Sequence, residues 1–304
     1  MGGSHAPHGH RHPSARGRLL VAMAVTLIVL IVQVFGSWLS GSLALLADAG
    51  HLLADVSGIG LAVLAATLSA RPATARRTYG YHRAEVLAAL VNAMLLIGLA
   101  AFLLIESWQR WGEAPDVRGV EMVVFAVIGL LGNLIVMGML HGGAHANLNV
   151  RGAYLHAFGD ALGSIAVIGA ALVIITTGWQ RADVIASAAV ALLILPRAFR
   201  LLGETVDVLL EATPRGIDLA DVQAGILRLP GVIGAHDLHV WQLTSGLPVL
   251  SVHVVVTDEV LADGGGARLL DALGECLAEQ FDVEHCTFQL EPVTHAAHER
   301  ACRV

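Results

Sequence analysis

Six long apolar segments dominate this chain of 304 residues and decide what it can fold into. A bilayer core about 30 Å thick is crossed by roughly 20 helical residues, and each segment reaches that length. Only 14% of the residues are charged, whereas soluble domains contain about 25%. The sequence therefore predicts a multi-pass α-helical membrane protein, with six transmembrane helices over residues 18–38, 42–69, 86–108, 119–140, 152–177 and 182–202.

Shorter stretches that alternate apolar and polar residues follow the last apolar segment and predict a soluble α+β domain. A helical pattern ends at Pro230-Gly231, and two strand patterns meet at a Ser245-Gly246 turn. A second helix and a third strand complete the order α-β-β-α-β, in which the helices cover one face of a sheet. We expect a His-rich disordered tail over residues 1–16 and a six-helix transmembrane domain over residues 17–210. A cytoplasmic domain over residues 211–293 and a C-terminal tail over residues 294–304 follow.

The basic residues predict the orientation in the membrane. All of them are arginines, because the chain contains no lysine. Ten lie on one side of the predicted spans and three on the other: Arg11, Arg16, Arg18, Arg71, Arg76, Arg77, Arg83, Arg151, Arg197 and Arg200 against Arg110, Arg118 and Arg181. Cytoplasmic connections carry the excess of basic residues. We therefore expect a protein of the cell (inner) membrane with both termini in the cytoplasm.

The remaining composition narrows the function. The net charge of −7 gives no reason to expect nucleic acid as a partner. The three cysteines form no CxxC pair, so free thiols in a reducing compartment are expected. The chain has no GxxxxGK[ST] phosphate-binding motif, so ATP is not predicted to drive its activity.

Two of the predicted spans carry ionisable residues in the same pattern, H-x-x-x-D. The pairs are His51 with Asp55 and His156 with Asp160. Residues four apart lie on one helix face, about 6 Å apart along the axis, so each pair can direct two ligands to one point. Two such helices facing each other supply the four ligands of a tetrahedral Zn²⁺ site. Ionisable side chains are costly in a bilayer and mark pathways there, which favours a metal route over polar packing between helices.

The ligand types indicate which metals such a site would take. Two carboxylates balance a double positive charge, as a site of low dielectric requires. Imidazole nitrogens favour Zn²⁺ over Mg²⁺ or Ca²⁺, and Cd²⁺ or Co²⁺ would fit a similar geometry. Asp48 lies nearer the outer end of its span, and its role stays open between a polar packing residue and a vestibule charge.

Four segments of the chain resemble the cation diffusion facilitator family, in particular its zinc-exporter branch of bacterial zinc, cobalt and cadmium exporters and vesicular zinc transporters. They read SLALLADAGHLLAD, YGYHRAEVLAALVNA, RGAYLHAFGDALGSI and HDLHVWQLTSG, and the resemblance covers residues 17–292. It implies that His51, Asp55, His156 and Asp160 bind the transported metal. It also implies a homodimer in the lipid bilayer, with a ferredoxin-like cytoplasmic domain, that exchanges cytoplasmic Zn²⁺ for protons.

Further histidines lie in the predicted cytoplasmic domain. His239 and His253 fall on adjacent predicted strands, and Glu291 ends a third. The resemblance implies that such residues bind zinc, as a structural or regulatory ion, at the dimer interface of this domain. His285 is a candidate for this cluster or for a second site. The alternative is that these are ordinary strand histidines on a solvated face.

The connection before the third span carries His82 and Arg83. The resemblance implies that a histidine at this position can join one of the cytoplasmic domain in an interfacial site, here His82 with His285. It also implies a charge pair at the dimer between Arg83 and an acidic residue below the sixth span. Glu211 is the first candidate for that partner and Asp207 the second.

Histidines also gather at both ends of the chain. HAPHGHRH near the start is typical of a disordered tract that can bind metal weakly, or that is only a solvated tail. The end of the chain, with His295, His298 and Cys302, is a looser version of the same pattern. Neither tract is predicted to be a defined site.

The site predicts a mechanism of alternating access. Metal binding needs deprotonated ligands, so metal and protons compete for the same groups and an inward proton gradient can drive export. Histidine suits this exchange because its ordinary pKa is about 6.5. An intramembrane metalloenzyme is disfavoured, because the H-E-x-x-H motif is absent, and paired carboxylates argue against haem binding. The alternative that remains is a membrane zinc sensor or receptor, which flux measurements would separate from a transporter.

Overall fold

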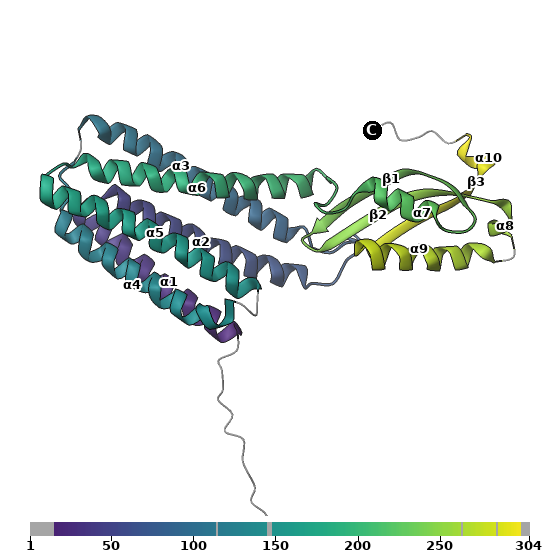
Figure 1. The fold of residues 1–304 in the computed structure, drawn as a ribbon, viewed down its shortest axis with the longest axis horizontal. Helices are drawn as coiled ribbons and strands as arrows, with labels where there is room; N and C mark the ends of the chain where they lie inside the picture. Colours follow the sequence, from purple (N-terminus) through teal and green to yellow (C-terminus); the bar gives the residue numbers. More distant parts are fainter. Residues whose placement is uncertain (1–14, 114, 145–147, 263, 284, 299–304) are drawn as a thin grey trace, which may run out of the picture. The chain divides into compact units, whose positions relative to one another are not determined.

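The computed structural model describes residues 15–113, 115–144, 148–262, 264–283 and 285–298. Its long helices are α1 (Ala15–Ser40), α2 (Leu43–Ser69), α3 (Ala84–Gly112), α4 (Gly119–Ala144), α5 (Leu148–Thr177) and α6 (Arg181–Leu209). All six are long and apolar enough to cross a membrane, which confirms the predicted six-helix fold. The main difference lies at α6, which continues to Leu209 instead of ending at residue 202. Figure 1 labels the helices.

The chain divides into two compact units, which we describe one at a time. The helical unit consists of Met1–Gly60 and Asn92–Phe199, and the sheet unit of Leu61–Val91 and Arg200–Val304. The helices α2, α3 and α6 therefore each contribute residues to both units. Most of the predicted tail, residues 1–14, and the end of the chain from residue 299 lie outside the described residues.

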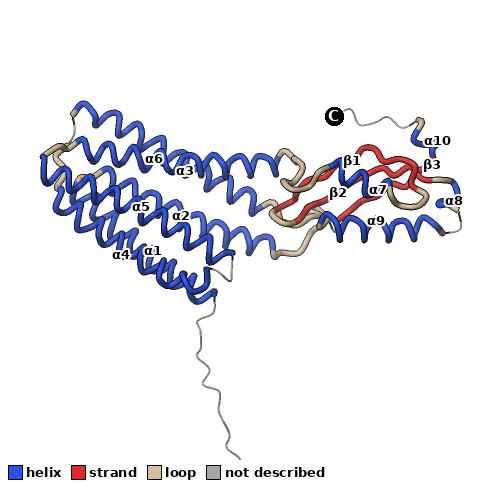
Figure 2. The backbone as a smooth tube through the Cα atoms, viewed as in Figure 1, coloured by secondary structure: helices blue, strands red, loops and turns tan. Residues whose placement is uncertain are grey.

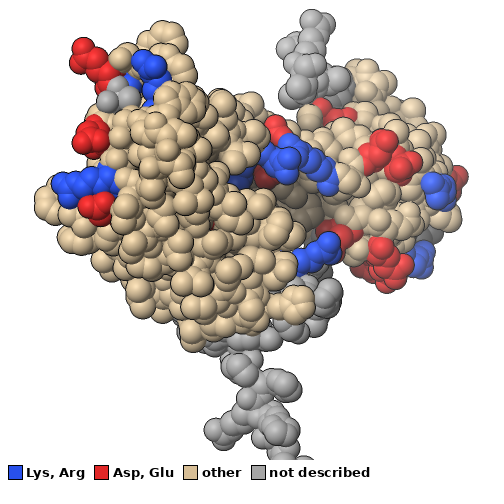
Figure 3. Space-filling model, turned by 60° about the vertical axis from the view of Figure 1, so that its left-hand side comes forward, with Lys and Arg blue, Asp and Glu red and all other residues tan. Residues whose placement is uncertain are grey.

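The outer surface of the long helices is apolar. Large side chains such as Ile31, Val120 and Leu193 are more than 60% exposed, which would be costly in water. Trp38 and Trp108 are the most exposed aromatic residues, near the ends of α1 and α3. Figure 3 shows a broad surface of the helical unit without charged side chains, with arginines and acidic residues at its margins. This surface is suited to lipid, and the chain is a multi-pass membrane protein.

Small residues allow the helices to pack closely. α4 lies along both α1 and α5. Ala126 of α4 and Ala171 of α5 are fully buried in one cluster, and Ala47, Ala100 and Ala191 are fully buried in another that joins α2, α3 and α6. Because lipid gives little hydrophobic drive for helix association, close packing of small side chains is the main source of contact energy.

The start of α2 is fixed by a carboxylate from α6. The tight connection from α1 passes through Gly41, whose φ of 74° is readily adopted only by glycine. Asp183 is 1% exposed and accepts hydrogen bonds from Ser42 Oγ at 2.5 Å, Leu43 N at 2.7 Å and Ala44 N at 3.1 Å. The first N–H groups of a helix lack partners within the helix. Asp183 therefore satisfies two of them and holds the first turn of α2 against α6.

The sheet unit has the predicted order α-β-β-α-β. It contains α7 (Leu219–Leu227), β1 (Val232–Thr244), β2 (Leu247–Val256), α9 (Gly265–Phe281) and β3 (His285–Pro292), with two short helices that the sequence did not predict, α8 (Asp258–Leu261) and α10 (Val293–Ala296). The sheet order is β1-β2-β3, with β1 antiparallel and β3 parallel to β2. The arrangement agrees with the predicted ferredoxin-like fold (Figure 2).

The two faces of this sheet differ in character. Val252 and Val254 of β2 are buried with Leu273 and Leu277 of α9 in one hydrophobic core. Successive side chains of a strand point to opposite faces, so His253 lies on the other face, which carries polar residues. β1 is irregular on this side, since its pairing with β2 shifts between His236 and His239.

Candidate metal centre

The two H-x-x-x-D pairs of α2 and α5 come together in the helical unit. One ligating atom from each of the four side chains can be chosen so that all lie within 4.8 Å of one another. The closest contacts run between the helices: His156 Nε2 is 2.8 Å from Asp55 Oδ2, and His51 Nε2 is 3.2 Å from Asp160 Oδ1. Contacts within each helix are longer, at 3.5 Å and 3.6 Å. Helical spacing thus places both pairs on facing surfaces, as the sequence predicted.

The four side chains are largely screened from solvent. Asp160 is 7% exposed, Asp55 13%, His51 14% and His156 26%. The rings of His51 and His156 lie 5.7 Å apart at 65°, and in every contact with the two carboxylates the atom nearer to the oxygen is Nε2. Two imidazole nitrogens and two carboxylates that face a common point form a donor set suited to a tetrahedral divalent cation.

A fifth charged residue reaches this group. Arg197 of α6 places Nη1 2.7 Å from Nδ1 of His156. From the sequence, Arg197 was counted only among the positive charges of the cytoplasmic side. A signal was present, because an ionisable residue inside a predicted span is itself a reason to expect a functional contact.

Asp48 belongs to a separate buried cluster. It is 2% exposed, accepts a hydrogen bond from Gln33 Nε2 at 2.5 Å and another from Ser164 Oγ at 3.3 Å. Gln33 is fully buried on α1, and its Oε1 makes no hydrogen bond with the described residues. Asp48 therefore joins α1, α2 and α5 and is not one of the four converging side chains.

A second group of possible metal ligands lies on the polar face of the sheet, opposite the face that packs against α9. His236, His253 and Glu291 each offer a ligating atom within 4.8 Å of the others. His236 Nε2 is 2.5 Å from Glu291 Oε1, and the two imidazole rings are 5.2 Å apart. Glu291 is 1% exposed, and His295 of α10 approaches its Oε2 to 3.8 Å. A carboxylate so deeply buried needs partners or a cation.

This group differs from the predicted one, which contained His239 in place of His236. In the structure His236 pairs directly with His253, whereas His239 pairs with Ser251 and contacts Asp237 Oδ1 at 3.3 Å. The cause is a bulge at Asp237, whose φ of 50° is left-handed. A bulge adds a residue to one strand and changes which side chain opposes the partner strand.

The predicted interfacial residues lie elsewhere in the sheet unit. His285, the first residue of β3, packs its ring against Tyr79, with centroids 5.7 Å apart. Neither His82 nor His285 belongs to a group of three or more ligating side chains among the described residues. Their joint metal site stays a prediction.

Arg83 and Glu211 form an ion pair within one chain, with Nη2 and Oε1 2.7 Å apart. Both side chains are exposed, at 40% and 58%, and such pairs contribute about 0–1 kcal/mol to stability. The second candidate, Asp207, contacts Arg215 instead at 3.3 Å. The role of the Arg83 pair at a dimer interface stays a prediction.

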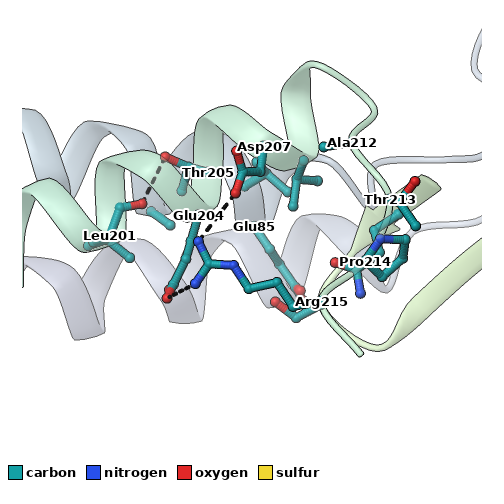
Figure 4. A pocket seen from close by; sticks show the side chains of 14 residues that line it. Glu85, Leu201, Glu204, Thr205, Asp207, Ala212, Thr213, Pro214 and Arg215 are labelled. Carbon is teal, nitrogen blue, oxygen red and sulfur yellow. Dashed lines mark hydrogen bonds and ion pairs between the residues drawn. The ribbon is translucent and has the colours of Figure 1, made fainter. Parts of the chain in front are cut away.

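Arg215 projects into a pocket of about 310 Å³ beside the end of α6 (Figure 4). It also contacts Glu204 at 3.4 Å, and Glu85 at the pocket wall accepts a hydrogen bond from Thr244 at 2.8 Å. Since each of these acidic side chains already has a polar partner, the pocket is not a third group of free metal ligands within the described part of the chain.

Comparison with known proteins places the whole chain in one family. The family model described as the cation efflux transmembrane domain matches residues 19–210, and that of the cation efflux protein cytoplasmic domain matches residues 214–293. The metal cation efflux system protein CzcD of Cupriavidus metallidurans is 43% identical, over 94% of this chain and 90% of CzcD. The zinc transporter ZitB of Escherichia coli is 42% identical, over 93% of this chain and 92% of ZitB.

Two further relatives are more distant or shorter. The cadmium, cobalt and zinc/H(+)-K(+) antiporter of Bacillus subtilis is 37% identical, over 95% of this chain and 93% of its own. A solved structure, the metal-bound C-terminal domain of the CzcD transporter, is 45% identical and covers 25% of this chain and 99% of its own, with a TM-score of 0.23. The family models and the relatives that match over nearly the full length agree, and the chain belongs to the cation efflux, or cation diffusion facilitator, family of metal-ion transporters, which are not enzymes.

Proposed function

We propose that the protein exports Zn²⁺ from the cytoplasm in exchange for protons, by alternating access, and that His51, Asp55, His156 and Asp160 form the transport site. The observation that carries this proposal is the convergence of the four side chains within 4.8 Å, from two helices that each have the length of a membrane span. The zinc transporters and the zinc-transporting antiporter among the relatives support the substrate and the exchange.

The ligand set matches this substrate. The carboxylates of Asp55 and Asp160 balance the charge of a divalent cation, so the loaded site is neutral. A neutral site can change the side to which it opens without exposing a net charge to the low dielectric of the membrane. The two imidazoles favour Zn²⁺, Cd²⁺ and Co²⁺ over the harder Mg²⁺ and Ca²⁺. Zn²⁺ is the substrate that we propose, with Cd²⁺ and Co²⁺ as further substrates.

Proton exchange follows from the same ligands. A protonated imidazole has no free electron pair for the metal, and a protonated carboxyl has lost the negative charge that balances the cation, so the site holds either the metal or protons. On the cytoplasmic side deprotonated ligands take up Zn²⁺. On the outer side protons displace the metal, and the protonated site returns. The sidedness requires both termini in the cytoplasm of an inner-membrane protein, which the distribution of arginines supports.

We further propose that the cytoplasmic domain associates as a homodimer and that His236, His253 and Glu291 bind zinc there. The domain that matches residues 214–293 is named for zinc-transporter dimerisation. The three side chains fit a zinc ion, because two imidazoles and one buried carboxylate are common zinc ligands. An ion bound there would neutralise Glu291 and tie β1 to β3.

The proposal is tested with purified protein in proteoliposomes that contain a zinc indicator and a pH indicator. With an acidic lumen, external Zn²⁺ should enter through molecules in the matching orientation, and the lumen should become more alkaline as zinc enters. Asp55→Ala and Asp160→Ala should reduce both signals to background. Asp116→Ala removes an exposed carboxylate outside the site and should transport within about twofold of the unaltered protein.

The possible outcomes separate the candidate functions. Near-normal zinc flux in either aspartate variant would refute the site assignment. Zinc flux without a change in lumenal pH would refute proton exchange. Zinc binding without any flux would favour the alternative, a membrane zinc sensor.

A further inference from the structure

Arg197 is a cation that touches the four-residue site from outside it. Its Nη1 lies 2.7 Å from Nδ1 of His156, the ring nitrogen that faces away from the two carboxylates. It is also within electrostatic range of Asp55 and of His51. The guanidinium therefore adds a fixed positive charge beside the two carboxylates.

The hydrogen-bonding chemistry of this contact is specific. A guanidinium only donates hydrogen bonds, so Nδ1 of His156 has to accept. A neutral imidazole has one N–H, which then lies on Nε2. That nitrogen is 2.8 Å from Asp55 Oδ2, a distance suited to donation. In this arrangement Nε2 has no free electron pair for a metal.

Metal binding requires the opposite arrangement. A zinc ligand offers its electron pair from one ring nitrogen, and the N–H of the neutral ring lies on the other, where it needs an acceptor. With zinc on Nε2, the N–H on Nδ1 of His156 would face the Arg197 guanidinium, and two donors would oppose each other. The metal would add a repulsive positive charge. The contact with Arg197 and a metal on His156 Nε2 therefore exclude each other.

We propose that Arg197 is a tethered counter-cation of the transport site: it contacts His156 when the site holds neither the metal nor protons, and it withdraws when the metal binds. The inference rests on the proposed assignment of the transport site. With the imidazoles neutral, the empty site carries the charges of two carboxylates in a region of low dielectric, which is costly. A guanidinium offsets part of that charge, and it competes with the metal for it.

The local structure allows Arg197 to move. It directly follows Pro196, which lies inside α6. Proline has no N–H, so one backbone hydrogen bond of the helix is missing in the turn that leads to Arg197, and such positions bend readily. The Arg197 side chain is exposed, so its withdrawal disrupts no packed core.

The proposal predicts a characteristic change in binding and transport. Without the guanidinium, zinc should bind more tightly and leave more slowly. A unit charge about 10–15 Å from a divalent ion changes the dissociation constant on the order of a hundredfold at an effective dielectric constant near 20. Arg197→Gln should therefore lower both KM and the maximal rate of transport. A residue that only supports the fold would weaken zinc binding when it is replaced.

The experiment uses the full chain with His236→Ala and His253→Ala, so that zinc on the sheet is not counted. The dissociation constant for zinc is measured by competition with a chelating dye, and KM and maximal rate in proteoliposomes. Arg197→Gln should lower the dissociation constant at least about tenfold, whereas Arg197→Lys, which keeps the charge, should restore a value near that of the parent. The matched control is Arg200→Gln, an exposed arginine one turn further along α6, which should have no effect.

A second measurement needs no substitution. Phenylglyoxal labelling of Arg197, read by mass spectrometry against Arg200 in the same sample, should rise when zinc is added, because the guanidinium leaves His156. Unchanged or reduced labelling, or an Arg197→Gln variant with unchanged or weaker zinc binding, would overturn the proposal.

Asp160→Asn distinguishes this failure from that of the proposed function. If Asp160→Asn loses zinc binding while Arg197→Gln leaves it unchanged, only the role of Arg197 is refuted. If Asp160→Asn binds zinc as the parent does, the transport site itself is wrongly assigned.

Discussion

Replacement of Asp183 should destabilise the helical unit through the first turn of α2. The carboxylate accepts three hydrogen bonds there and is 1% exposed. Removal of a helix cap costs about 0.5–2 kcal/mol, and hydrogen bonds to a charged group are worth about 1.5–3 kcal/mol each. Because these contributions overlap, we expect Asp183→Ala to lower the free energy of unfolding by about 3 kcal/mol, and Asp183→Asn, which keeps one acceptor oxygen, by about 1 kcal/mol.

The effect should extend to the proposed transport site. His51 lies eight residues after Leu43, the start of α2, or about 12 Å along the helix at 1.5 Å per residue. A displaced first turn moves His51 and Asp55 together, so zinc should bind more weakly to Asp183→Ala than to the unaltered protein.

In the assay, the detergent-solubilised protein is heated to a series of temperatures, and the protein that remains folded is quantified by size-exclusion chromatography. Zinc binding is measured on the same samples. A loss of about 3 kcal/mol corresponds to a fall in Tm of roughly 6–12 °C for a unit of this size. Asp116→Ala, which removes an exposed acidic side chain hydrogen-bonded to Gln180, is the matched control. An Asp183→Ala protein that melts within about 2 °C of the parent, less than 1 kcal/mol would give, would show that the cap does not hold α2.

Four other predictions concern the two metal sites, the thiol of Cys286 and the N-terminal tail. His51→Asp exchanges a nitrogen ligand for oxygen and adds negative charge, so competition assays should show a shift towards harder cations such as Mn²⁺; an unchanged ranking would count against His51 as a ligand. In a chain with Asp55→Ala and Asp160→Ala, which lacks the proposed transport site, His236→Ala should abolish the zinc-dependent rise in Tm and His239→Ala should leave it; the reverse result would restore the ligand set predicted from sequence. Burial raises the pKa of the Cys286 thiol to about 11, so in a variant whose other cysteines are serine its alkylation at pH 7 should be slow and should accelerate as the pH rises towards 11; fast, pH-independent labelling would contradict this. Deletion of residues 2–13 should weaken apparent zinc affinity only slightly, and complete loss of transport would show that the tail has another role.

The convergence of His51, Asp55, His156 and Asp160 could be predicted because helical periodicity determines which residues share a face. His51 and Asp55 have to lie on one face of α2, as His156 and Asp160 do on α5, and only the approach of the two helices remained to be shown. The six spans could also be predicted, since length and composition suffice to identify them.

Side chains that act across elements were harder to predict. The bulge at Asp237 exchanges His239 for His236 opposite His253, and neither Asp237 nor its direct neighbours is a glycine or part of a turn motif that would mark it. Asp183 belongs to α6 but accepts hydrogen bonds from the start of α2, about 140 residues earlier in the chain. No pattern within one segment reports such a contact.

Arg197 shows a different limit. The rule that counts basic residues near the ends of spans assigned Arg197 to the membrane surface. Its position inside the predicted span 182–202 was therefore not interpreted as a reason to expect a contact within the membrane. The contact with His156 depends on how α5 and α6 are placed relative to each other, which no pattern within either segment reports.

The irregular pairing of β1 has a consequence for the solubility of the sheet unit. β1 is an edge strand, and its pairing with β2 is shifted at three places between Val232 and Thr244. A long regular edge offers a row of free N–H and C=O groups on which another chain can add a strand, and this is a common start of aggregation. Bulges twist such an edge and interrupt the row. The deviations that bring His236 into the metal group therefore also discourage uncontrolled strand addition between neighbouring domains.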